Sequence, residues 1–204
     1  GRIYENSFHC IPDATPFRPE RTTIKPAIHG VQTALVVGPA GEEIYTDEYG
    51  RIKVQFYWDR QGKKDEKSSC WIRCAQFAAG KGWGAMSIPR IGQELIISYL
   101  DGDPDQPIAT GRAYRETNLP PYELPKHKTR MTIKSRSHKG RGFNELRFED
   151  ELGQEEVYVH AERDKNVHIK HDNTAFVGND RKEEVGNDEH VTVGHDQSHQ
   201  IGRD

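Results

Sequence analysis

The sequence predicts an all-β protein in which a small antiparallel Greek-key barrel precedes a β-helix wound from three identical chains. Three observations predict this fold class. Short strand-like runs bounded by Gly, Pro and Asp fill the first part of the chain, with no competing helical period of 3.6 residues. A Pro-rich stretch, NLPPYELP, then separates them from a charged, His-rich remainder. In that remainder, residue types return at a spacing of eight.

The composition argues against several classes of protein. Apolar residues make up 33% of the 204 positions, and adding the 19 Gly leaves the total below the roughly 45–50% of ordinary globular domains, so a single thick core is not expected. The net charge of −3 provides no positive excess to collect nucleic acid or an anionic membrane surface. Three cysteines are too few for a disulfide framework, and no signal-peptide pattern opens the chain. Because the chain begins without Met and stops within a repeat, we expect it to be a piece of something longer.

Four parts are predicted along the chain: a linker over residues 1–25, a barrel over 26–117, a Pro-rich linker over 118–125 and a needle over 126–204. In the barrel, RIKVQFYW alternates strictly, which predicts a strand with one inward face made of Ile52, Val54, Phe56 and Trp58. Further strand-like runs cover 34–37, 70–77, 94–100 and 108–113. Roughly five short strands of this kind are typical of a barrel of the OB type.

The needle is predicted from its eight-residue repeat. The apolar residues Val177, Val185, Val193 and Ile201 are each followed by glycine, namely Gly178, Gly186, Gly194 and Gly202. Asp recurs at the same spacing in six places, at positions 164, 172, 180, 188, 196 and 204. Eight extended residues span about 26 Å, enough for a short strand and a tight corner. Gly and the Asn-Asp pairs that follow two of these glycines suit such corners.

Strand alternation predicts which side chains point inward. The expected core of the needle is an apolar stripe made of Val167, Val177, Val185, Val191, Val193 and Ile201. A single-chain solenoid with three faces would use about 24 residues per coil and complete fewer than the roughly three repeats a stacked array needs. Three chains wound around one axis give more than five layers, so we predict a homotrimer. The alternative is a solvated, low-complexity tail without structure.

The barrel segment from Asp47 to Glu94, the run DGDPDQPIATGRA, the Pro-rich linker and the Val-Gly octads together resemble the VgrG spike proteins of bacterial type VI secretion. These proteins are similar to the cell-puncturing spike of contractile phage tails. The resemblance implies an OB-fold barrel followed by an intertwined trimeric triple-stranded β-helix that is driven through a target envelope and carries effectors. It also implies that the protein is made in the bacterial cytoplasm and then secreted into a target cell. Implied partners are tube, sheath and baseplate proteins, a tip-capping protein, effectors and, transiently, the envelope.

No catalytic, cofactor or metal site is predicted. Cys70 and Cys74 lie about 13 Å apart along a straight strand, beyond disulfide reach, and we interpret them as small core residues. Three aspartates at 101, 103 and 105 imitate the opening of a calcium loop, but Gln106 replaces the required Gly, so a solvated turn is favoured. The basic run over 126–142 could contact phosphate, but pairing with acids on neighbouring strands is favoured.

Glu183 and His199 occupy inward phases of the repeat, so threefold symmetry would bring three copies of each close to the axis. Such rings could bind an ion, although hydrogen bonding among the polar side chains is the favoured interpretation. A second function remains open for the whole chain: a trimeric fibre or adhesin stalk whose barrel binds a ligand. A ligand that saturates the barrel with micromolar affinity would favour the stalk.

Overall fold

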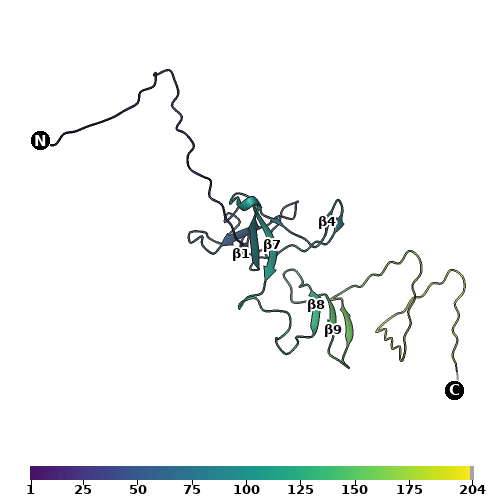
Figure 1. Cartoon of the computed structure of the whole chain (residues 1–204). Helices are drawn as coiled ribbons and strands as arrows, with labels where there is room; N and C mark the ends of the chain where they lie inside the picture. The colour runs from purple at the N-terminus through teal and green to yellow at the C-terminus, as the bar shows by residue number, and fades with distance from the viewer. Residues whose placement is uncertain (203–204) are drawn as a thin grey trace. The chain divides into compact units, whose positions relative to one another are not determined.

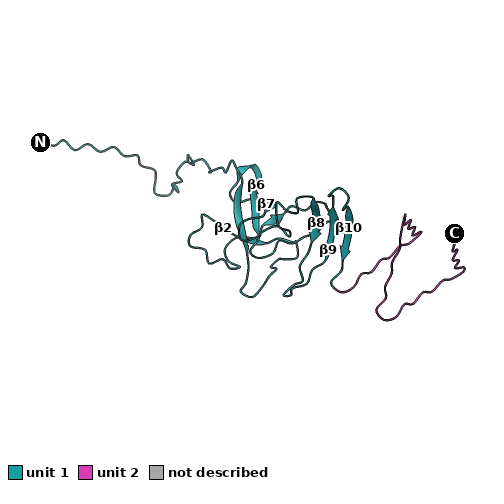
Figure 2. Cartoon of the chain, turned by 90° about the horizontal axis from the view of Figure 1, so that it is seen from below, with its two compact units in different colours: residues 1–162 teal, residues 163–204 magenta. Residues whose placement is uncertain are grey.

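The computed structural model describes residues 1–202 and consists of strands joined by loops (Figure 1). Within this range no helix is long and apolar enough to cross a membrane. The one helical turn is a 3₁₀ segment over Leu100–Gly102. Two compact units are present, Gly1–Glu162 and a second unit that begins at Arg163 (Figure 2). The all-β class predicted from the sequence is confirmed.

A five-stranded sheet forms the body of the first unit, in the order β2-β1-β6-β7-β3. Neighbouring strands are antiparallel except for the short β3, which runs parallel to β7. The strand bounds are β1 Gln32–Val37, β2 Lys53–Phe56, β3 Arg73–Cys74, β6 Glu94–Tyr99 and β7 Pro107–Ala113. A separate two-residue hairpin, β4 Ala79–Gly80 and β5 Trp83–Gly84, leaves the body between β3 and β6.

The core of this sheet follows from alternation along its strands. Its members share a relative exposure of 4% or less and come from five segments of the chain: Ala34, Val36, Ile52, Val54, Ile72, Leu95, Ile97 and Ala109. Burial of each large aliphatic side chain contributes about 1.5–3 kcal/mol before entropy is counted. The predicted inward positions Ile52 and Val54 are therefore part of the core.

The prediction for the end of the same strand is wrong. β2 ends at Phe56, and the chain turns at the next two residues, which leaves Trp58 65% exposed. The indole of Trp58 stacks on Phe56 with ring centroids 5.2 Å apart, and its Nε1 donates to the side-chain oxygen of Gln32 at 3.0 Å. Phe56 is half-buried and packs against the core, as predicted, whereas Trp58 stays outside, because the turn ends the alternation that the sequence pattern extended to Trp58.

The first unit ends in a three-stranded antiparallel sheet, β8 Arg130–Lys134, β9 Glu145–Glu149 and β10 Glu156–His160, in the order β10-β9-β8. Residues 1–25, by contrast, contain no strand. The linker and needle boundaries proposed from the sequence stay predictions, since the needle was placed from residue 126 and the compact units divide after Glu162.

Candidate assembly interface

One face of the β8–β10 sheet is apolar and open to solvent. The register sets Met131 and Val157 on either side of Phe148, and Ile133 and Val159 on either side of Leu146. Five of these six side chains are exposed in the single chain, from 36% for Leu146 to 73% for Ile133, and Phe148 is half-buried. Below, these six residues are called the apolar face.

The opposite face is polar and is the better buried of the two. Glu145 is only 4% exposed, and its Oε1 accepts hydrogen bonds from the hydroxyls of Tyr122 and Thr132 at 2.5 and 2.8 Å. The amino group of Lys134 lies 3.5 Å from the other carboxylate oxygen. Burial alone would raise the pKa of Glu145, but the donors Tyr122 and Thr132 and the charge of Lys134 hold it below its usual value.

The ring of Tyr122 covers this polar face. Three cations lie over it, with Arg130 at 4.8 Å, Lys134 at 5.2 Å and Arg147 at 5.7 Å from the ring centroid. Arg147 also donates to the Tyr122 hydroxyl at 3.0 Å and to Glu156 at 2.6 Å, and these bonds raise its pKa. Aromatic rings attract cations through their electron-rich face, so this one tyrosine contacts cations from both β8 and β9.

This sheet is inverted relative to an ordinary half-buried sheet. Its charged face is closed by residues of the same unit, while its apolar face is left exposed by the other described residues of that unit. A soluble protein rarely leaves a contiguous apolar surface in water unless the surface binds something. The apolar face is therefore a candidate assembly interface.

The second unit also exposes apolar side chains. All six residues of the predicted stripe are exposed in the single chain: Val167 67%, Val177 50%, Val185 48%, Val191 60%, Val193 44% and Ile201 88%. The backbone bends at 162–163, 170–171, 178–179, 186–187 and 194–195, which repeats the eight-residue spacing. Three of these bends start at or include the predicted corner residues Gly178, Gly186 and Gly194.

The corner glycines have room around them. Nothing lies within 4 Å of a Cβ placed on Gly178, Gly186, Gly194 or Gly202, and none of the four adopts a left-handed φ in the single chain. The requirement for glycine at these positions thus stays a prediction about the assembled form. Asp204, the last residue in the octad series, lies outside the described residues.

Sequence reasoning missed two parts of the candidate interface. Ile169 is 44% exposed and lies eight residues before Val177, but Lys170 follows it where the pattern has Gly. The apolar face was missed because its strands are interrupted by charged loops and lack the octad. Val159 lies eight residues before Val167, and this spacing was the signal that could have extended the stripe into β10.

The other candidate residues lie apart from one another. Glu183 pairs with Arg181 at 2.8 Å and His199 bonds Gln197 at 2.9 Å, so in one chain each contacts a near neighbour. Among residues 1–202 no group of three or more His, Cys, Asp or Glu could hold a metal ion. At the calcium-like turn, the amino group of Lys25 bridges Asp103 at 2.6 Å and Asp105 at 3.0 Å. Cys70 is exposed and Cys74 half-buried, so the core interpretation holds only in part for Cys74 and is wrong for Cys70.

Two cations of the basic run pair with acids on the neighbouring strand, so the interpretation favoured from the sequence holds for this part of the run. Arg130 contacts Glu149 at 2.7 Å and Lys134 contacts Glu145 at 3.5 Å, both between β8 and β9. Arg130 and Lys134 are thus neutralised by acids of β9, which makes them poor ligands for a phosphate group.

Comparison with known proteins agrees with this geometry. Residues 39–114 match the family model of the type VI secretion system and phage-baseplate injector OB domain, and residues 131–204 match the bacteriophage T4 gp5 C-terminal trimerisation domain. The spike proteins VgrG1b and VgrG1a of Pseudomonas aeruginosa are each 53% identical over 81% of this chain. A Vibrio cholerae protein named actin cross-linking toxin VgrG1 is 52% identical over 79% of it. The chain spans 23%, 26% and 15% of these three relatives, respectively.

Proposed function

Since the chain belongs to the VgrG family of type VI secretion spike proteins, we propose that it forms the barrel and upper needle of a homotrimeric spike that punctures a target-cell envelope and carries effectors. The observation that carries this proposal is the inverted β8–β10 sheet followed by the exposed apolar stripe. Both surfaces have the chemistry of a protein core, and each is exposed among the described residues of its own unit.

A trimer supplies the missing cover. Three copies of the apolar face around one axis would place six apolar side chains per chain in a shared core, and the octad stripe would continue that core along the needle. Each large aliphatic side chain contributes about 1.5–3 kcal/mol when fully buried, an upper bound before the ordering entropy is subtracted. The match of residues 131–204 to a trimerisation domain supports three as the number of copies.

A mechanical role follows from interleaved strands. Bending or peeling a needle of this kind requires the ladders from all three chains to break at once, whereas a single-chain rod could yield one turn at a time. The outward positions of the repeat are charged or polar, which favours passage through water and headgroups without adhesion. The proposed partners are tube, sheath and baseplate proteins around the barrel, with a tip-capping protein and effectors on the needle.

We assign no catalytic step to this segment. The relatives VgrG1a and VgrG1b are named as spike proteins, and the relative named as a toxin shares only 15% of its length with this chain. The described residues show a layered polar network around Tyr122, in which every carboxylate is held by a cation or hydroxyl and serves the sheet.

The test is the mass of the purified chain by light scattering at several concentrations, with the expected value three times that of one chain. Replacing Val185→Asp and Val193→Asp together should give single chains, because six unpaired charges would lie inside the trimer. The matched control replaces the outward neighbours, Lys182→Asp and Thr192→Asp, and should stay trimeric. A well-folded single chain before any substitution would contradict the proposal.

A further inference from the structure

The β4–β5 hairpin is a preformed projection of the barrel. Lys81 and Gly82 make its two-residue turn, with Gly82 at a φ of +78° that suits glycine. A Cβ on Gly80 would collide with the indole of Trp83, and a Cβ on Gly84 would collide with the carbonyl of Ala78. Gly80 therefore leaves room for the indole of Trp83 against the opposite strand of the hairpin, and Gly84 leaves room for the carbonyl of Ala78.

The foot of the hairpin is fastened to the barrel. The amide of Ser87 donates to the side chain of Gln76 at 3.1 Å, and Arg112 on β7 donates to the Ser87 hydroxyl at 3.0 Å. The amide of Ala85 also donates to the carbonyl of Ala78 at 2.9 Å. The projection is thus held at its base.

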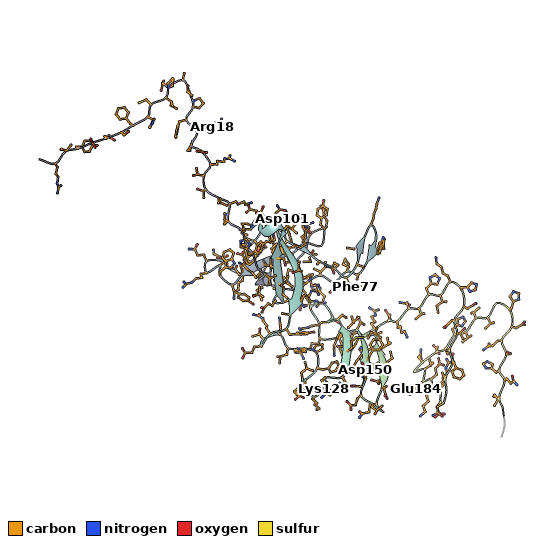
Figure 3. The ribbon with its side chains drawn as sticks, in the orientation of Figure 1. Arg18, Phe77, Asp101, Lys128, Asp150 and Glu184 are labelled. Carbon is orange, nitrogen blue, oxygen red and sulfur yellow. The ribbon has the colours of Figure 1, made fainter. Side chains whose placement is uncertain are left out.

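Large apolar side chains on this projection face solvent. Phe77, labelled in Figure 3, is 99% exposed, Met86 83% and Trp83 72%. Exposed aromatic and Met side chains on a fixed element are typical of the buried centre of a protein interface. Met86 and Ser87 at the foot of the hairpin line a hollow of their own chain, whereas Phe77 and Trp83 do not line it, so these two aromatic side chains are the ones free to contact a partner.

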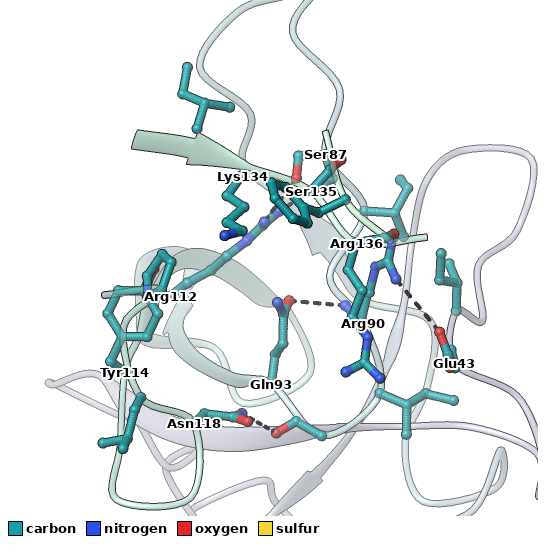
Figure 4. Close-up of a pocket in the computed structure, with 18 of the residues that line it drawn as sticks. Glu43, Ser87, Arg90, Gln93, Arg112, Tyr114, Asn118, Lys134, Ser135 and Arg136 are labelled. Carbon is teal, nitrogen blue, oxygen red and sulfur yellow. Dashed lines mark hydrogen bonds and ion pairs between the residues drawn. The ribbon is translucent and has the colours of Figure 1, made fainter. Parts of the chain in front are cut away.

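A hollow of about 1210 Å³ lies in the same unit, between the barrel and strand β8 (Figure 4). Its lining includes five cations, one carboxylate, Glu43, and apolar side chains such as Ile88 and Ile133. The cations are Arg90, Arg112, Lys134, Arg136 and Arg141. Arg90 ties the two walls together by donating to the carbonyl of Arg136 at 2.6 Å.

We propose that the β4–β5 hairpin of one chain docks in this groove of the next chain, so that Trp83 meets the guanidinium groups of the groove wall around the trimer. This inference rests on the trimer proposed above. A closed ring of three copies needs two different, complementary patches on each copy, and the hairpin and groove are such a pair. Tryptophan is the preferred aromatic partner of arginine, which gives the contact chemical complementarity.

Continuity with the apolar face identifies the occupant as a second copy of this chain. Ile133 belongs both to the lining of the groove and to the apolar face. A second chain that covers the apolar face therefore also lies next to the groove. The docked hairpin would bury its exposed apolar side chains and place them at the junction of barrel and needle.

The test is cross-linking of the full chain in a background with Cys10→Ser, Cys70→Ser and Cys74→Ala. Two pairs are made, Lys81→Cys with Leu119→Cys and Lys81→Cys with Ser135→Cys, which keep Trp83 and the arginines of the groove in place. Each variant is oxidised and run on a denaturing gel without reductant. Because the two patches differ, each double variant should give covalent trimers, and each single variant should give no covalent trimer. The control pair is Lys81→Cys with Lys67→Cys, whose loop does not line the groove.

Light scattering before oxidation separates the outcomes. Covalent trimers from at least one groove pair and none from the control pair would support the inference. A trimeric mass without a covalent trimer from either groove pair would overturn the docking and leave the spike proposal standing. A bond closed within one chain, seen as loss of both thiols without a mass increase, would also overturn the docking. A single-chain mass would overturn the trimer itself.

Discussion

The hydroxyl of Tyr122 donates a 2.5 Å hydrogen bond to the buried carboxylate of Glu145, which joins the segment after the barrel to the middle strand of the β8–β10 sheet. Glu145 is 4% exposed, so this carboxylate depends on the protein for the bonds that water would otherwise supply. The same hydroxyl accepts from Arg147. The Tyr122 hydroxyl therefore provides a hydrogen-bond partner for both Glu145 and Arg147 on the polar face.

Replacing Tyr122→Phe tests this relationship. The ring and its cation contacts remain, while the Glu145 carboxylate and the Arg147 guanidinium each lose a partner. We expect the variant to be destabilised by about 1–3 kcal/mol per chain, the cost of an unmatched buried group. Urea unfolding followed by circular dichroism measures this difference. Tyr4→Phe, at a side chain that is 85% exposed, should leave the midpoint unchanged.

Glu149 predicts a loss of stability in acid. Hydrogen bonds from the hydroxyl of Thr129 and from Arg130 lower the pKa of Glu149 from 4.5 to about 2. Since the folded pKa lies below the unfolded value, the stabilisation is complete above pH 4.5 and is lost as the pH falls towards 2. The depressed pKa of Glu145 acts in the same direction.

Urea midpoints measured from pH 7 to pH 2 should therefore fall most steeply below pH 4.5. Glu149→Gln should start from a lower midpoint at pH 7 and show a shallower fall. An equal slope for the variant and the parent protein would mean that other carboxylates control acid unfolding. Glu155 is not a suitable control, because its own pKa is lowered by backbone hydrogen bonds.

The barrel shows what sequence alternation can predict and where it stops. Ile52 and Val54 were predicted to point inward and are fully buried, because a strand puts alternate side chains on one face. Trp58 follows the same pattern and is exposed, because the chain turns after Phe56 and a hydrogen bond to Gln32 retains the indole outside. Alternation does not specify where a strand ends.

One part of the candidate interface could likewise be predicted from the sequence, and the other could not. The octad stripe was visible because one residue type recurs at one spacing, which is a local property of the sequence. The apolar face depends on pairing Met131 with Phe148 and Phe148 with Val157. These contacts join strands across two loops, so their register follows from tertiary structure. The polar layer around Tyr122 was hidden for the same reason.

The buried barrel core predicts a large effect of truncation. Ile97 has no exposed surface and packs in the centre of the five-stranded sheet. Ile97→Ala should lower the free energy of unfolding by about 2–5 kcal/mol, since both transfer energy and a cavity are involved. Thermal unfolding monitored through the tryptophans would measure it. Ile24→Ala, at a side chain that is 89% exposed, is the matched control and should change stability little.

The apolar face yields the sharpest test of assembly at the top of the needle. Ile133→Asp with Val159→Asp places two charges per chain on a surface that is 73% and 55% exposed at these positions in the single chain. If each chain were self-sufficient, such surface substitutions would cost little. If three copies share this face, six charges would enter a common apolar core, and the trimer should dissociate or lose its upper layers.

Light scattering reports the mass, and hydrogen exchange of β8–β10 reports the local opening that a partial loss would cause. Leu152→Asp is the matched control, because Leu152 is 90% exposed but lies in the turn between β9 and β10, away from the apolar face. It should remain trimeric with protected strands. An unchanged mass and unchanged exchange in the Ile133 and Val159 double variant would show that the apolar face stays in water, and the trimer would then have to be held by the octads and the barrel alone.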